Sequence, residues 1–292
     1  MPSFKTHSIH GELVLPGIDK KTEISKEDIK SFCIGPDAMA ITDSKTFNYQ
    51  HANRTRRFFC TLINLIKRKK LLENSEVMAF LYSQIDHFVL DSTMHPLIYY
   101  MTENIKPRHV LKPHALIENW IDDYTCLKYK RKQLGYYRKW LIQNKKLISL
   151  INEVYHKVYG VEGEGNKFSL GMLSAIMFDS LAKTNAIGIA PLVIRLANLG
   201  DFTYRKNYKR ALPYLNLDHQ LWYNPETMEE SHESFDDLWK KSIEDSQETI
   251  NDVNNYLYQD KELTNKLILN DTSWDTGLPC KRGQTLKYVK KY

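Results

Sequence analysis

The chain has 292 residues, 42% of them hydrophobic, which is enough apolar material for a buried core. This hydrophobic content argues against a disordered chain, and the net charge at pH 7 is +6. No apolar run has the length of a signal peptide or of a membrane span, so the sequence predicts a cytoplasmic protein without a transmembrane segment. The four cysteines are far apart and form no CxxC pair, which predicts buried free thiols.

Apolar residues recur at spacings of three and four along the chain, which predicts an all-α fold. The predicted helices are, in chain order, 56–72, 75–100, 114–121, 134–159, 170–183, 190–198 and 233–260. Gly160 is a predicted C-terminal cap, and the glycine-rich stretch 161–167 a predicted loop. We expect a single domain over 1–292, with a metal site within 1–120 and a helical lobe over 165–292.

Seven of the ten histidines precede residue 115, and several lie in helical register with carboxylates. His87, Asp91 and His95 follow one another at spacings of four, and His114 precedes Glu118 by four, so each set shares one face of a helix. Imidazole with carboxylate binds zinc without thiolates. One such pair alone is more often an ordinary hydrogen bond, and Asp91 has the alternative of bonding to a neighbouring hydroxyl. Two pairs together favour a metal site.

The stretch DHFVLDSTMHP at 86–96 resembles the zinc-dependent phospholipase C-like family, which is related to bacterial phospholipases C and fungal single-strand zinc nucleases. Other segments that resemble the family are GPD at 35–37 with His51 fourteen residues later, the pair His114 and Glu118, WYNP at 222–225, and SFDDL at 234–238. The resemblance implies a helical domain with a zinc cluster between its helices.

The resemblance also implies which residues bind two or three zinc ions. The ligands implied for the first ion are Asp37, His51, His87 and Asp91, and those for the second are His95, His114 and Glu118. A third ion would share Asp91 and be held by His7 and by the free amine of Pro2, once Met1 is removed. The alternative for His7 is a position on a flexible N-terminal tail.

The implied reaction is hydrolysis of a phosphodiester, such as a phospholipid, by a metal-bound hydroxide, with Asp37 as general base as well as ligand. Ala38 replaces the aromatic residue that the family pattern places after its first aspartate ligand, which argues against choline recognition. Phe47 and Tyr49, just before His51, are either a head-group pocket or, as we expect, core residues.

Other functions remain open at this stage. The positive charge and the 18 tyrosines would also suit a single-strand nuclease or a nucleotide phosphohydrolase, by contacting phosphates and stacking on bases. The apolar runs 171–178 and 187–193 are either part of the core or the walls of a slot for lipid chains. A helical HD-type phosphohydrolase needs histidine before aspartate, but here Asp86 precedes His87. In a non-catalytic metal-binding protein the ions would be structural. However, the implied set of His95, His114 and Glu118 leaves a position open for water.

The remaining charged residues carry weaker expectations. The basic runs 67–70, 128–132 and 287–291 are either solvated helix faces or contacts with nucleic acid or with an anionic membrane surface. No role is assigned to His10, His109 or His156, and His219 and His232 are expected on the surface.

Overall fold

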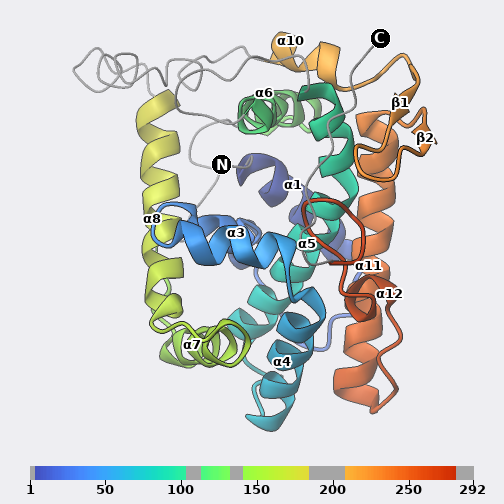
Figure 1. Cartoon of the computed structure of the whole chain (residues 1–292). Coiled ribbons are helices and arrows are strands. Elements are labelled where there is room, and N and C mark those ends of the chain that lie inside the picture. The colour runs from blue at the N-terminus through green and yellow to red at the C-terminus, as the bar shows by residue number, and fades with distance from the viewer. Residues whose placement is uncertain (1–3, 103–112, 132–140, 184–207, 281–292) are drawn as a thin grey trace.

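The computed structural model of the protein (Figure 1) describes residues 4–102, 113–131, 141–183 and 208–280, without the side chains of 113–115 and 178–183. The α-helices are α1 (Phe4–Val14), α2 (Lys26–Phe32), α3 (Ser44–Ala52), α4 (Thr55–Arg68), α5 (Ser75–Thr102), α6 (Pro113–Lys128), α7 (Lys145–Tyr159), α8 (Glu164–Lys183), α10 (Tyr208–Ala211), α11 (Phe235–Gln259) and α12 (Lys266–Leu269). Three turns of 3-10 helix are η1 (Leu15–Gly17), η2 (Gly35–Ala40) and η4 (Leu212–Tyr214). Strands β1 (Trp222–Tyr223) and β2 (Glu230–Ser231) form a short antiparallel hairpin. The predicted all-α class is confirmed.

Helix α5 is the centre of the fold, and α1, α2, α6 and α11 pack against it (Figure 1). Its residues from Val77 to Ser92 are all buried. A helix that is apolar on every side is stable only when other elements surround it. The polar side chains that α5 carries, among them His87 and Asp91, therefore lie inside the protein and need partners there.

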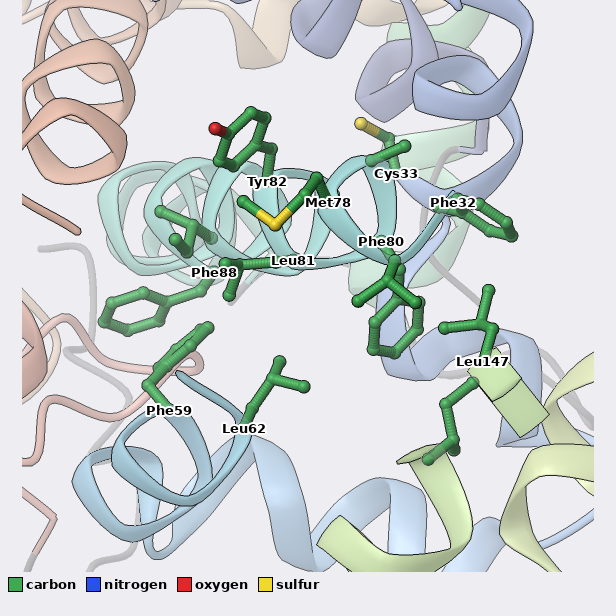
Figure 2. Packing of buried hydrophobic residues seen from close by; sticks show 14 of the residues in the cluster. Phe32, Cys33, Phe59, Leu62, Met78, Phe80, Leu81, Tyr82, Phe88 and Leu147 are labelled. Atoms are coloured by element: carbon green, nitrogen blue, oxygen red, sulfur yellow. The ribbon is translucent and has the colours of Figure 1, made fainter. Parts of the chain in front are cut away.

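Two hydrophobic clusters hold these helices together. The larger one runs from Phe4 to Trp274 and includes Phe59 of α4 and Phe88 of α5, whose side chains approach each other in Figure 2. Their ring centroids are 5.3 Å apart. The smaller cluster joins the second half of α5 to α6 and α11. Because both clusters draw on the two halves of the sequence, the C-terminal elements form part of the same interior as the N-terminal helices.

Several predicted helix boundaries were wrong. The helix predicted over 134–159 begins at Lys145 in the described residues, because the Asn144 side chain accepts hydrogen bonds from the backbone of Lys146 and Leu147 and caps it. The predicted loop 161–167 ends early, since α8 already starts at Glu164, whose carboxylate lies 2.6 Å from Lys167 Nζ.

Other boundaries were closer. Helix α4 stops at Arg68 rather than at residue 72, because Lys70 takes a left-handed backbone with φ of 55°. Helix α6 extends beyond the predicted 114–121, whereas 75–100 and 233–260 are confirmed to within two residues. A capping box at Ser234 begins α11. The predicted helix 190–198 lies outside the described residues, and α1, α2 and α3 were not predicted.

The cysteines are all free, but only Cys33 and Cys126 are buried, so the predicted burial is wrong for Cys60 and Cys280. Burial raises the pKa of the Cys280 thiol to about 11. Within the described residues, no helix combines the length and the apolar character that a membrane span needs.

Candidate metal centre

Helix α5 contributes three polar side chains to the candidate centre. His87, Asp91 and His95 lie one turn apart on the same face, as their spacing predicts. His87 Nε2 is 3.0 Å from Asp91 Oδ2, and His95 Nε2 is 3.7 Å from Asp91 Oδ1. All three side chains are buried, so the Asp91 carboxylate has exchanged water for imidazole rings.

The turn η2 and the helix α3 place Asp37 and His51 against this face. Gly35 begins η2 with φ of 58°, and a Cβ atom at this position would lie only 2.5 Å from Cγ of His87. The turn can approach the imidazole this closely only because residue 35 is glycine. Asp37 Oδ1 lies 3.2 Å from His51 Nε2, and Asp37 Oδ2 lies 3.5 Å from His87 Nε2. His51 Nε2 is also 3.5 Å from Asp91 Oδ2.

Helix α1 brings His7 to the other side of Asp91, where His7 Nε2 is 3.1 Å from Asp91 Oδ1. The rings of His7 and His87 stack, with centroids 3.9 Å apart. His7 is thus part of a buried helix, and the alternative of a flexible tail is wrong for this residue. Residues 1–3, including the Pro2 amine, lie outside the described residues.

Helix α6 completes the described set with Glu118, whose Oε1 lies 3.2 Å from His95 Nε2. His114 begins the same helix one turn earlier, but its side chain lies outside the described residues. A cavity of about 20 Å³ between α1, α5 and α6 is lined by His7, Asp91, His95 and Glu118, among others. This space is large enough for one water molecule or a metal ion but not for an organic substrate.

Backbone carbonyls fix the orientation of three of the imidazoles. The Nδ1 atoms of His51, His87 and His95 each lie 2.9 Å from a carbonyl oxygen, those of Phe47, Cys33 and Trp274 respectively. A carbonyl oxygen only accepts hydrogen bonds, so Nδ1 must be the protonated nitrogen in each ring. The Nε2 atoms are left to face the carboxylates, which is the usual arrangement of histidines that bind a metal.

Several buried atoms at the centre of this cluster make no hydrogen bond in the described structure. They are both carboxylate oxygens of Asp37, Oδ2 of Asp91, Nδ1 of His7, and the Nε2 atoms of His51 and His87. Some are within 3.5 Å of each other, as His87 Nε2 is of Asp37 Oδ2 and of Asp91 Oδ2, without forming a hydrogen bond. Orphaned buried acceptors are costly, and a cation among them would remove that cost. One atom each from His7, Asp37, His87 and Asp91 lie within 4.8 Å of one another, which fits a metal ion.

The electrostatics of the cluster favour positive charge at its centre. Burial lowers the pKa of His95, but the carboxylates of Asp91 and Glu118 outweigh burial and raise the pKa to about 10. The same competition raises the pKa of His7 and His51. Burial raises the pKa of Asp91, yet its surrounding histidines lower it well below the usual range. Protons thus compete with a metal ion for these sites.

Comparison with known proteins identifies the family of the chain. The sequence profile of the family described as zinc dependent phospholipase C matches residues 6–161, just over half of the chain. The chain belongs to this family. Each of the predicted metal-binding side chains falls within the matched segment, so zinc is the metal that family membership indicates for the His/Asp cluster. Neither the curated proteins nor the solved structures gave a match.

Two residues near the centre had not been singled out from the sequence. The Trp274 carbonyl accepts a hydrogen bond from His95 Nδ1. Asp275 Oδ1 lies 3.9 Å from the same nitrogen and accepts a hydrogen bond of 3.3 Å from the Tyr99 hydroxyl. Both residues lie in an irregular segment almost 180 residues beyond His95, outside the family match. No sequence spacing connects them with the histidines, so no signal could have found them.

Of the two aromatic residues before His51, Phe47 packs against the core as expected, and Tyr49 does not. Phe47 is partly buried and packs against the His51 ring, with centroids 4.5 Å apart. Tyr49 is 41% exposed, so its interpretation as a core residue was wrong. Tyr49 instead contacts Tyr159 and lies under Arg54 at the surface.

The remaining histidines and apolar runs agree better with the sequence analysis. His156, His219 and His232 are exposed, whereas His109 and the run 187–193 lie outside the described residues. His10 is fully buried, and its ring contacts the Asp86 carboxylate at 2.7 Å and the Ser242 hydroxyl at 2.8 Å. In the run 171–178, Met172, Ala175 and Ile176 are buried in the core rather than lining a slot.

Proposed function

We propose that the protein is a zinc-dependent phosphodiester hydrolase of the phospholipase C type. The observation that carries the proposal is the convergence of orphaned, buried imidazole and carboxylate atoms in a family that depends on zinc. Asp37, His51, His87 and Asp91 would hold one ion, and His95, His114 and Glu118 a second. His7, beside Asp91, would take part in holding a third.

The chain's own residues would prepare the reaction in three ways. Zinc, when bound, would lower the pKa of the water molecule on it and neutralise charge on the phosphate oxygens. The carbonyls behind His51, His87 and His95 keep their Nε2 atoms in position, so little reorganisation is needed. Asp37 has two carboxylate oxygens without hydrogen bonds, and it can take up a proton from the attacking water as well as serve as a ligand.

We further propose a phospholipid as the substrate, with a head group other than choline. Ala38 stands where the family pattern has an aromatic side chain, and it is buried. A Cβ atom on Gly171 of α8 would lie 1.7 Å from the Ala38 carbonyl oxygen, so α8 packs directly on this turn. We also propose that the whole chain acts as one domain. We propose further that the protein resides in the cytoplasm, and cell fractionation tests this location.

A single-strand nuclease on the same scaffold is the second candidate. Arg54, Arg56 and Arg57 follow His51 closely in sequence and line a surface cavity of about 610 Å³ beside α4. Among the described residues, Arg56 and Arg57 form no ion pair with a carboxylate, and Arg57 Nη2 donates to the neutral carbonyl of Lys157, so their charge is available to phosphate groups.

Substrate screening distinguishes these candidates. Protein purified without a metal-affinity tag would be assayed, with zinc and with chelator, on vesicles of phosphatidylethanolamine, phosphatidylcholine or phosphatidylglycerol, and on a single-stranded oligonucleotide. We expect zinc-dependent release of diacylglycerol, lost in Asp37→Asn and retained in the exposed control Asp19→Asn. Cleavage of the oligonucleotide alone would favour the nuclease. A zinc-loaded protein that cleaves none of these and no chromogenic phosphodiester would contradict the enzymatic proposal.

A further inference from the structure

Residues 272–280, which we call the clasp, form a closed loop after α12. Thr272 pairs with Pro279 in an isolated antiparallel bridge, and Ser273 N donates to Leu278 O at 2.7 Å. Gly277 N donates to Ser273 O at 3.0 Å. The loop is therefore held in shape by its own backbone, although it has no regular secondary structure. It lies well beyond the segment that matches the family.

One side of the clasp holds the end of α3, where His51 lies. Trp274 N and Ser273 Oγ both donate to the carbonyl of His51, at 2.9 and 3.1 Å. The Trp274 indole is fully buried, and its Nε1 donates to Thr55 Oγ1 at 2.9 Å. Its ring also packs against the His51 ring, with centroids 5.5 Å apart. These contacts restrict both the backbone and the side chain of His51.

The other side of the clasp holds α5 at His95. The Trp274 carbonyl accepts from His95 Nδ1, and Asp275 lies behind it, bonded to the Tyr99 hydroxyl. Pro96 has no N–H to donate to the Ser92 carbonyl one turn earlier in the helix. Gly277, with φ of 70°, packs against that carbonyl so closely that a Cβ atom would lie 2.5 Å from its oxygen. A proline in α5 and a glycine in the clasp thus allow the two to meet.

We infer that the clasp is a positioning element of the zinc centre, with Trp274 and Asp275 as its positioning residues. The inference rests on the proposed function, in which His51 and His95 belong to different zinc ions. Because one short loop bonds to both histidines, it fixes the helices that carry them relative to each other. The His87 Nδ1 makes its hydrogen bond outside the clasp, to the Cys33 carbonyl, and His87 meets the clasp only through its ring, whose centroid lies 5.7 Å from that of Trp274 within the described residues.

Two glycine variants test the clasp. Gly277→Ala introduces backbone strain at φ of 70° together with a collision with Ser92, whereas Gly160→Ala introduces the same strain at φ of 74° in open space. We expect a 10- to 100-fold lower zinc affinity in Gly277→Ala, measured by competition with a chelator, which is the usual effect of losing a residue that orients a metal ligand. Gly160→Ala should leave the zinc affinity unchanged. Asp275→Asn, at a partly exposed site, is expected to weaken zinc binding less.

A second readout does not depend on zinc or on activity. In ¹⁵N-histidine spectra of the zinc-free protein, the Nδ1–H signal of His95 should shift or exchange in Gly277→Ala and Asp275→Asn. The Nδ1–H signal of His87, which donates to the Cys33 carbonyl, should shift less. Unchanged zinc affinity and unchanged His95 signals in both variants would overturn the inference and leave the proposed function intact. A wild-type protein that binds no zinc would instead overturn the proposed function, and with it the inference.

Discussion

Replacing Asp91 by asparagine removes a carboxylate that lies within 3.7 Å of four imidazoles, those of His7, His51, His87 and His95. Asparagine has almost the same shape but no charge, so packing is conserved while the electrostatic attraction for a cation is lost. We expect the variant to fold and to lose most of the stabilisation that zinc gives to the wild-type protein.

The size of this effect follows from linkage. Zinc at a thousand times its dissociation constant stabilises the folded protein by about 4.1 kcal/mol. For a chain of this size, roughly 2 °C per kcal/mol gives a rise in Tm of about 8 °C. If the loss of Asp91 weakens binding at least 100-fold, the stabilisation falls by about 2.7 kcal/mol. The remaining rise would be about 3 °C.

Differential scanning fluorimetry with zinc and with chelator measures both shifts. Asp19→Asn is the matched control, because the Asp19 side chain is exposed and its one ion pair within the described part of the chain is with Lys21. The control should retain the whole zinc-dependent rise. An equal rise in Asp91→Asn and in the wild-type protein would refute the assignment of Asp91 to the centre.

Three further predictions concern pH, the turn at η2 and the core. In the zinc-free protein the pKa of His95 is raised to about 10, so its protonation stabilises the fold fully below pH 6.5, and this contribution disappears as the pH rises toward 10. Thermal scans in chelator should therefore show Tm falling between pH 6.5 and pH 10. Over the same interval the apparent zinc affinity should increase, because fewer protons compete with the metal ion. Gly35→Ala should cost about 1–2 kcal/mol in backbone strain and displace His87, lowering zinc affinity at least tenfold. Gly163→Ala has the same strain at φ of 76°, but its added Cβ meets nothing, so its zinc affinity should not change. Tyr82→Phe removes the bond from a buried hydroxyl to Asn254 Oδ1 (2.6 Å) and should cost about 1–3 kcal/mol in urea unfolding without changing zinc affinity.

The sequence predicted the longest helices of the fold. The 25-residue helix α11 repeats its apolar residues at three and four, whereas the 28-residue helix α5 is an apolar stretch too long for a strand, and both were located to within two residues. The shorter helix α2 has seven residues, too few for a periodic pattern to stand out. It forms because its apolar side chains, such as Ile29 and Phe32, are buried against other helices.

The same distinction applies to the site. The spacing of His87, Asp91 and His95 gave their common face from the residues alone, whereas the inclusion of Asp37, His51 and His7 depended on the family resemblance. Their proximity to α5 results from tertiary packing, for instance from the close approach of Gly35 to His87. Such contacts join positions far apart in the chain and leave no local pattern.

The most direct test of a zinc centre is anomalous diffraction from crystals of the tag-free protein, measured above and below the zinc absorption edge. We predict anomalous peaks that appear only above the edge. One peak should lie among Asp37, His51, His87 and Asp91, and a further peak beside His95 and Glu118. Crystals grown with zinc that show no such peak at the cluster, or zinc only at surface histidines, would contradict it.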